Sequence, residues 1–188
     1  MRELIVTEFV SLDGVMEAPG GEPGYAHSGW VSDFFSDELG AFKGEEQLGA
    51  EVMILGRVTY ESFHGAWPKR EGAMAEKINT MRKVVISRTL REAGGDWEDT
   101  TLSSDLEGSV RALKEEDGGP ILIPGSRSIA QALLAAGLVD QLNLQVFPLV
   151  LGSGARLYPD SDDKITLELA SSETLDSGVV LQSYRPAS

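Results

Sequence analysis

The run Leu55-Gly56-Arg57-Val58-Thr59-Tyr60-Glu61 begins at the end of a short apolar stretch, Val52 to Leu55. Such a stretch, bounded by a glycine, is typical of a parallel strand that is buried on both faces. The glycine lets the backbone approach a ligand closely, and a helix expected from about Val58 to Phe63 offers unpaired N–H groups to a phosphate. The run therefore predicts a strand, a turn and a helix that together bind an anion.

Two further strand ends carry the same chemistry. We expect buried strands over Lys83–Ser87, followed by Arg88, and over Pro120–Ile123, followed by Pro124-Gly125-Ser126-Arg127. Ligands of open α/β sheets collect at the carboxyl ends of the strands, and arginines beside the turns suit a multiply charged nucleotide. The sequence contains neither GxGxxG nor GxxxxGK[ST], which argues against an ordinary dinucleotide fold and a P-loop. The three turns predict a nucleotide-binding α/β domain.

The remaining elements complete a mixed sheet in a single domain spanning residues 1–188. Strands alternate with helices and then give way to a terminal ribbon, which indicates a mostly parallel central sheet, helices on both faces and a C-terminal antiparallel ribbon. The long loop from Asp13 through Trp30 is typical of a binding loop. The other predicted strands are Leu4–Leu12, Val139–Val150, Leu167–Ala170 and Val179–Tyr184. The other predicted helices run from Ser32 or Asp33 to Leu48, over Leu106–Glu115 and over Ser126–Ala136. We expect the first of these helices to bury Phe34, Leu39, Phe42 and Leu48.

Composition narrows the function classes. The chain has 16 basic and 30 acidic residues, a formal net charge of -14, and no cysteine. Such an acidic surface disfavours nucleic acid and anionic membranes as partners, and the lack of cysteine excludes thiolate metal sites and disulfides. The two histidines, His27 and His64, show no metal-ligand spacing, so we expect no metal. The sequence has no apolar stretch of the roughly 20 residues that a membrane helix needs and no signal-peptide pattern, so we expect a cytoplasmic protein.

In this order, the three turns resemble the dihydrofolate reductase superfamily. Gly56-Arg57-Val58-Thr59-Tyr60-Glu61 is similar to that family's GRxT(Y/W)E element, which implies that Gly56, Arg57 and Thr59 meet the phosphates of NADPH. Val85-Ile86-Ser87-Arg88 resembles the strand end that holds the 2′-phosphate side, and Ile123-Pro124-Gly125-Ser126-Arg127 resembles the turn under the pyrophosphate. The closing strands are matched by Asp140–Leu144 and by Gly154-Ala155-Arg156-Leu157-Tyr158-Pro159-Asp160.

Within the superfamily, the chain resembles the C-terminal reductase domain of the riboflavin-biosynthesis deaminase–reductase and its stand-alone bacterial relatives. The matching features are Ser11-Leu12-Asp13-Gly14, Gly125-Ser126, Leu138-Val139-Asp140 and the run from Pro148 to Gly154. The zinc-deaminase half is absent, because its His/Cys signature does not occur. Pro124 stands where dihydrofolate reductases have the first glycine of a pair, and it lacks an N–H, so the cradle must use Gly125, Ser126 and later residues.

Two acids are candidate catalytic residues. Asp13 lies beside Gly14 at the end of the first strand, where it either meets the substrate or caps its own turn. Glu38-Leu39-Gly40-Ala41-Phe42-Lys43 matches the acid-Leu-x-x-Phe-Lys pattern of the pterin-binding helix, which implies a substrate role for Glu38, although such a Glu also fits a solvated face. Tyr25 and Trp30 of the long loop fit either a lid or the core.

The resemblance implies an NADPH-dependent reductase that transfers hydride to a small heterocyclic or ribosylamino-pyrimidine substrate, like a 5-amino-6-(5-phosphoribosylamino)uracil reductase. Arg156 and Lys69 are candidates for binding a substrate phosphate. The alternatives are a genuine dihydrofolate reductase and a non-catalytic nucleotide-binding module. Relatives of the reductase domain also imply a homodimer that uses the late strands.

Overall fold

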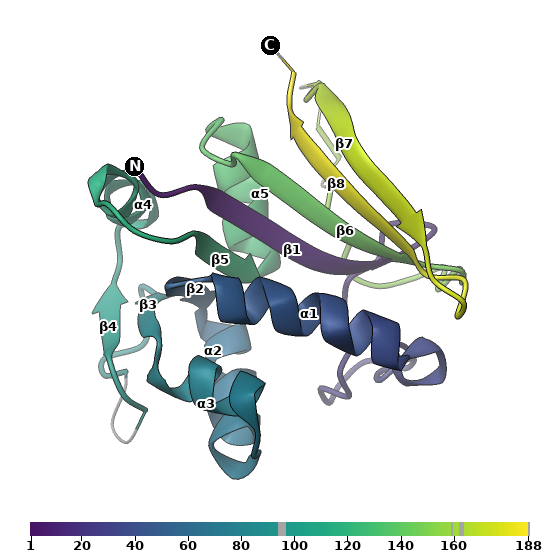
Figure 1. Cartoon of the computed structure of the whole chain (residues 1–188), viewed down its shortest axis with the longest axis horizontal. Helices are drawn as coiled ribbons and strands as arrows, with labels where there is room; N and C mark the ends of the chain where they lie inside the picture. Colours follow the sequence, from purple (N-terminus) through teal and green to yellow (C-terminus); the bar gives the residue numbers. More distant parts are fainter. Residues whose placement is uncertain (94–96, 159, 162–163, 188) are drawn as a thin grey trace.

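The computed structural model describes residues 1–93, 97–158, 160–161 and 164–187, and an eight-stranded sheet in the order β4-β3-β2-β5-β1-β6-β8-β7 runs through them (Figure 1). The six strands from β4 to β6 are parallel, whereas β8 is antiparallel to β6 and to β7. The mostly parallel sheet with an antiparallel ribbon is thereby confirmed. The strands are β1 (Leu4–Ser11), β2 (Val52–Gly56), β3 (Arg82–Ile86), β4 (Thr100–Ser103), β5 (Ile121–Pro124), β6 (Gln141–Phe147), β7 (Leu167–Thr174) and β8 (Val180–Pro186).

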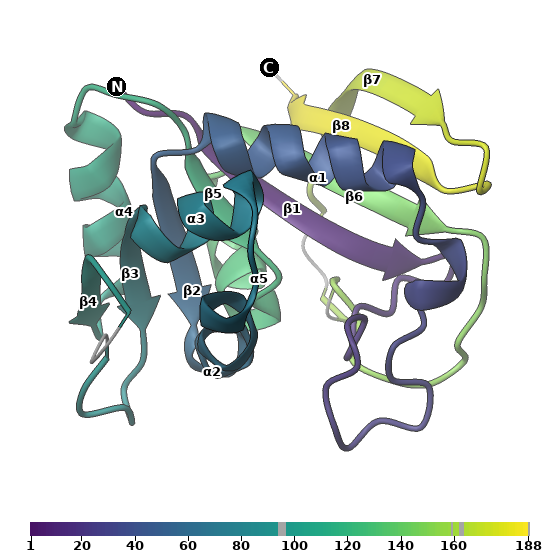
Figure 2. The ribbon, with the colours of Figure 1, turned by 60° about the horizontal axis from the view of Figure 1, so that its bottom comes forward.

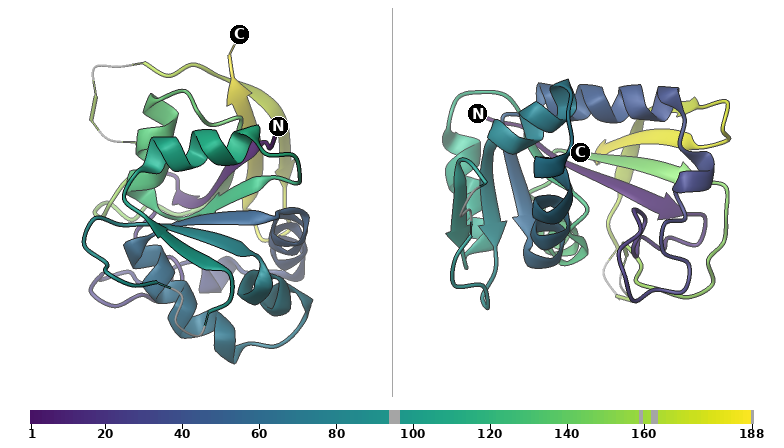
Figure 3. Two further views of the ribbon diagram at one scale, coloured as in Figure 1. Left: turned by 90° about the vertical axis from the view of Figure 1, so that its left-hand side faces the viewer. Right: turned by 90° about the horizontal axis from the view of Figure 1, so that it is seen from below.

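Helices cover both faces of the sheet (Figures 2 and 3). On one face, α4 and α5 pack with the side chains of Val6, Ile54 and Ile123 in the largest apolar core. On the other face, α1, α2 and α3 cover side chains such as Met53, Leu55 and Phe147 in two further cores. The helical elements are α1 (Asp37–Gly49), α2 (Arg57–Ala66), α3 (Ala73–Thr80), α4 (Leu106–Glu115), α5 (Arg127–Ala135) and the 3-10 turns η1 (Ser32–Phe34) and η2 (Trp67–Lys69).

The first helix differs from the sequence prediction. It begins at Asp37, because the Ser36 side chain caps it by accepting a hydrogen bond from Leu39 N at 3.2 Å. Residues 32–34 form a separate 3-10 turn. Leu48 is 49% exposed and not buried, because the face of α1 that packs on the sheet carries Leu39, Lys43 and Gln47 instead.

Two other boundaries also differ. β6 ends at Phe147, three residues before the predicted end, since Pro148 cannot donate to a strand partner. The segment from Gly154 to Tyr158 forms one bridge, between Val15 and Arg156, in place of a closing strand, and Pro159 lies outside the described residues. In the part of the chain that the structure describes, no helix is long and apolar enough to cross a membrane.

Candidate cofactor and substrate site

The carboxyl ends of β2, β3 and β5 lie along one edge of the sheet. Gly56 at the end of β2 is opposite Ile86 at the end of β3, and β2 also pairs with β5. The helix after β2 packs on Met53 and Leu55 through Tyr60, whereas the helix after β5 packs on the opposite face. Adjacent strands whose helices leave to opposite faces create the crevice in which α/β sheets bind ligands.

The β2–α2 and β5–α5 turns interlock at this crevice. Gly56 N donates to Ser126 Oγ at 2.9 Å, and Ser126 N donates to Thr59 Oγ1 at 3.1 Å. Gly125 and Ser126 both have positive φ, 63° and 61°, so the chain turns sharply before α5. The structure therefore brings together four of the predicted cofactor residues, Gly56, Thr59, Gly125 and Ser126.

The three predicted arginines stand exposed around the turns. Arg57 pairs with Glu61 one helical turn later, with an N–O distance of 3.0 Å. Arg88 follows Ser87, whose Oγ accepts hydrogen bonds from Thr89 N at 3.2 Å and Leu90 N at 2.9 Å. Arg127 is the first residue of α5. Neither Arg88 nor Arg127 has an ion-pair partner among the described residues, so both cations are available to an anion.

Asp13 lies at the carboxyl end of β1, where its carboxylate ties together two loops. It accepts hydrogen bonds from Ser11 Oγ at 2.7 Å, Leu151 N at 3.1 Å and Gly152 N at 2.9 Å. These bonds, that from Ser11 foremost, lower the pKa of Asp13 from 3.8 to about 2. An acid that is ionised at neutral pH is a poor proton donor. The geometry favours the turn-capping role for Asp13, and a catalytic role stays a prediction.

Glu38 lies apart from the interlocked turns. It is exposed in the first turn of α1, and its Oε2 accepts a hydrogen bond from Asp176 N at 3.2 Å, in the turn between β7 and β8. Polar residues of α1 that do face the sheet include Lys43, Glu46 and Gln47. Lys43 Nζ donates to Thr7 Oγ1 at 2.7 Å and to Glu46 Oε2 at 2.5 Å. The pattern match did not reveal this buried pair.

The long loop packs along the same edge and reaches α2. Trp30 is buried and donates from Nε1 to Glu17 O at 2.8 Å, which favours its role as a core anchor. Tyr25 donates to Ser153 O at 2.7 Å. Ser62 of α2 donates to Glu22 Oε1 at 3.3 Å, so the loop touches the cofactor side of the edge. Of the two phosphate candidates, Arg156 donates from Nε to Asp13 O at 3.0 Å, and Lys69 is exposed in η2.

Sequence reasoning also missed Glu8, an acid within β1. Its side chain is 2% exposed and shares a face with Val6 and Val10 in the core under α5. The signal was present, because an acid at an inward position of a strand flanked by valines breaks the apolar alternation.

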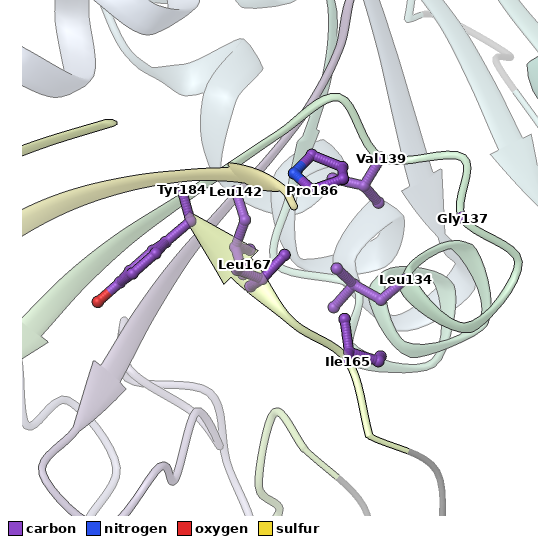
Figure 4. A pocket seen from close by; sticks show the side chains of 8 residues that line it. All are labelled: Leu134, Gly137, Val139, Leu142, Ile165, Leu167, Tyr184 and Pro186. Carbon is purple, nitrogen blue, oxygen red and sulfur yellow. The ribbon is translucent and has the colours of Figure 1, made fainter. Parts of the chain in front are cut away.

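An apolar cavity of about 70 Å³ lies elsewhere, near the amino-terminal end of β6 (Figure 4). None of the predicted site residues lines it. Its lining residues are Leu134, Gly137, Val139, Leu142, Ile165, Leu167, Tyr184 and Pro186. The interlocked turns therefore form an open edge of the sheet and not part of this cavity.

Comparisons with known proteins agree with this geometry. The uncharacterized protein YyaP of Bacillus subtilis (strain 168) is 28% identical over 95% of this chain and 92% of its own length. The fold matches a Thermotoga maritima deaminase/5-amino-6-(5-phosphoribosylamino)uracil reductase with a TM-score of 0.69, 16% identity, and coverage of 99% of this chain and 57% of that chain. It also matches the Enterococcus faecalis dihydrofolate reductase complexed with NADP(H), with a TM-score of 0.65 and 16% identity. This match covers 99% of this chain and 97% of the reductase chain.

These likenesses confirm the dihydrofolate-reductase-like fold. The family model described as the RibD C-terminal domain matches residues 2–181, nearly the whole chain. The chain therefore belongs to the RibD C-terminal domain family.

Proposed function

We propose that the chain is an NADPH-dependent reductase of the RibD C-terminal type. The observation that carries the proposal is the interlocking of the two turns, in which Ser126 accepts from Gly56 N and donates to Thr59. This arrangement leaves the N–H groups of Arg127 and Ser128, at the start of α5, without acceptors inside the helix. Such N–H groups bind phosphate, and exposed arginines beside them add charge-assisted bonds.

The residues fit the pyrophosphate of a dinucleotide. A Cβ added at Gly56 would lie 3.4 Å from Ile129 Cδ1 and 3.5 Å from Ser126 Oγ, and one added at Gly125 would lie 3.5 Å from Thr59 Cγ2. These are ordinary contacts with the neighbouring turn, and Gly125 has φ 63°, a backbone conformation that favours glycine. Arg88 lies beside Ser87 after the neighbouring strand β3, and in this proposal it would bind the 2′-phosphate that distinguishes NADPH from NADH.

A bound NADPH supplies a hydride, and the chain supplies position and charge. Gly56, Thr59, Gly125 and Ser126 would hold the pyrophosphate side. The end of β1 and the long loop would hold the substrate next to the nicotinamide and exclude water. The substrate class that we propose is a small heterocycle or a ribosylamino-pyrimidine, in keeping with the reductase named for the Thermotoga maritima neighbour.

The position of Glu38 argues against the alternative of a genuine dihydrofolate reductase. The resemblance would have Glu38 bind the pterin, whereas its carboxylate is exposed and accepts a hydrogen bond from Asp176 N in the β7–β8 turn. The buried pair of Lys43 and Glu46 takes the sheet-facing positions of α1. A Glu38→Gln variant should therefore leave any oxidation of NADPH with dihydrofolate unchanged.

We also propose that the protein is a homodimer. β7 is an edge strand whose residues are mostly exposed, including Leu169 at 55%. Open edges with apolar side chains are usually covered, and a second copy would cover this one. Sedimentation velocity of the wild type and of Leu169→Lys tests this: a dimer that dissociates in the variant is expected, and a monomeric wild type contradicts it.

The decisive experiment measures binding and turnover separately. Quenching of protein fluorescence by NADPH, weaker with NADH, is expected for the wild type. Oxidation of NADPH is then followed by the loss of absorbance of the reduced nicotinamide at about 340 nm. The substrates tested are a panel of heterocyclic imines and ribosylamino-pyrimidines. Absence of NADPH binding would refute the proposal, and tight binding without turnover would favour the non-catalytic module.

A further inference from the structure

Glu8 is a buried acid without a partner. Its side chain is 2% exposed, and Oε1 is buried with no hydrogen bond to any described residue. An ionised carboxylate in such a place has lost water and gained no donor, which strongly favours the protonated form. Glu8 therefore carries a transferable proton inside the protein.

Glu8 stands beside the turn that precedes α5. β1 pairs with β5 only as far as Thr7, opposite Pro124, and Gly125 N donates to Thr7 O at 3.3 Å. The next residue of β1 is Glu8, one position beyond the last residue of β1 that pairs with β5. The acid therefore flanks the crevice in which we place the cofactor.

Three titratable groups are coupled to Glu8: Lys43 and Glu46 act on it, and it acts on Tyr158. Burial raises the pKa of the Glu8 carboxyl well above its usual range; the Lys43 ammonium of α1 opposes this shift, and the Glu46 carboxylate of α1 adds to it. Burial also raises the pKa of the Tyr158 hydroxyl, and Tyr184 of β8 and Glu8 raise it further. Tyr158 itself is 47% exposed.

The other carboxylates at this edge are already engaged. Each accepts a hydrogen bond or pairs with a cation. These residues are Asp13, Glu17, Glu22 and Glu61. Of the described acids at the edge, Glu8 alone combines burial with the lack of a partner.

We propose that Glu8 is the proton donor of the reduction, an inference that rests on the proposed function. Hydride from NADPH adds to the carbon of a C=N or C=O group of the substrate, and the π bond breaks. The nitrogen or oxygen takes the Glu8 proton, so the substrate is reduced by two electrons and the dinucleotide is oxidised. The Glu8 carboxylate then takes up a proton from water.

The test uses Glu8→Gln, which keeps the size and neutrality of the side chain but cannot donate a proton at neutral pH. We expect kcat to fall by roughly 10²-fold or more, with the affinity for NADPH unchanged. The wild-type kcat should decrease as the pH rises through the Glu8 pKa, and this limb of the profile should be missing in Glu8→Gln. Glu115→Gln, at the exposed end of α4, is the matched control and should behave like the wild type.

A second measurement needs no variant enzyme to be active. Carbon-13 NMR of the Glu-labelled wild type should show one carboxyl that stays protonated at neutral pH, absent from Glu8→Gln. An ionised Glu8 at neutral pH, or equal turnover by Glu8→Gln across the pH range, would overturn the inference. A protonated Glu8 in a protein that neither binds nor oxidises NADPH would instead show that the proposed function is wrong, and the donor role would fall with it.

Discussion

The two halves of the carboxyl edge are built from different kinds of contact. On the cofactor half, the turns after β2 and β5 bond directly to each other through Gly56, Thr59 and Ser126. On the substrate half, Asp13 binds Leu151 N, and Glu38 binds Asp176 N, each 138 residues away along the chain. Short motifs specify the first half, whereas the second half depends on loops that meet only after folding.

The largest effect is expected from a side chain introduced into the proposed phosphate-binding turn of the cofactor half. Gly125→Val places a branched side chain at φ 63°, facing Thr59, and should weaken NADPH binding roughly 10- to 100-fold by removing one or two phosphate bonds. Gly137→Val is the matched control, because Gly137 has φ 64° at the other end of α5 with nothing within 4 Å of an added Cβ. Fluorescence titration of both variants checks this; equal affinities would contradict the assignment of the turn.

A smaller effect on the same half concerns the choice of cofactor. Arg88→Ala removes an exposed cation beside Ser87 and should raise the Kd for NADPH about 10-fold while leaving that for NADH unchanged. Arg91→Ala, an exposed arginine three residues later, is the control. A parallel loss of both affinities in Arg88→Ala would place this residue on the shared pyrophosphate and not on the 2′-phosphate.

The substrate half should respond in stability and not in cofactor binding. Asp13→Asn weakens the bonds from Ser11, Leu151 and Gly152, so we expect Tm to drop by several degrees at neutral pH with an unchanged NADPH affinity. The folded-state pKa of Asp13, about 2, lies below 3.8, so its contribution is complete above about pH 4 and is lost as the pH falls toward 2. Calorimetry at several pH values should therefore show the two proteins converging in acid.

This prediction also separates the two roles considered for Asp13. If Asp13→Asn keeps its Tm but loses turnover, the carboxylate acts on the substrate. If it loses stability and keeps kcat with a saturating substrate, the carboxylate is a tether. The hydrogen bonds favour the second result.

The sequence predicted what depends on local patterns. Leu106–Glu115 matches α4 residue for residue, since Asp105 caps it, an apolar stripe buries Val110 and Leu113, and glycines follow. The three strand ends lie within one residue of where periodicity placed them, because a buried parallel strand is a continuous apolar run.

Elements with weaker patterns were not predicted. α3 (Ala73–Thr80) buries only Ala75 and Ile78, and β4 (Thr100–Ser103) is a half-exposed edge strand. The role of Glu8 depends on which face of β1 its side chain lies on, and the role of Glu38 depends on which face of α1 packs on the sheet. A six-residue motif match does not show which face of the helix packs on the sheet. The start of the helix was also predicted too early, at Ser32 or Asp33, whereas α1 begins at Asp37.

The smallest expected effect concerns a buried lysine near the amino-terminal end of β3, a strand whose carboxyl end belongs to the cofactor half. Lys83 of β3 is fully buried, and its Nζ donates to Asn79 O at 2.9 Å, Met81 O at 2.6 Å and Glu98 O at 3.0 Å. Burial lowers the pKa of Lys83 from 10.5 to about 8, although Asp99 and Glu98 oppose this shift. Between these two pH values the unfolded chain binds the proton that the folded chain has released, so the free energy of unfolding rises with pH.

Urea titrations of the wild type and Lys83→Met at pH 8 and 9 measure this contribution. The wild type should gain roughly 1 kcal/mol relative to the variant over that interval. A gain of this sign means that the three carbonyls do not fully compensate for the buried charge, so β3 carries a cost at neutral pH. A difference between the two proteins that stays constant or falls with pH would mean that the three carbonyls do compensate for the buried charge. The polar groups around Lys83 would then be as fully hydrogen-bonded as those of the interlocked turns.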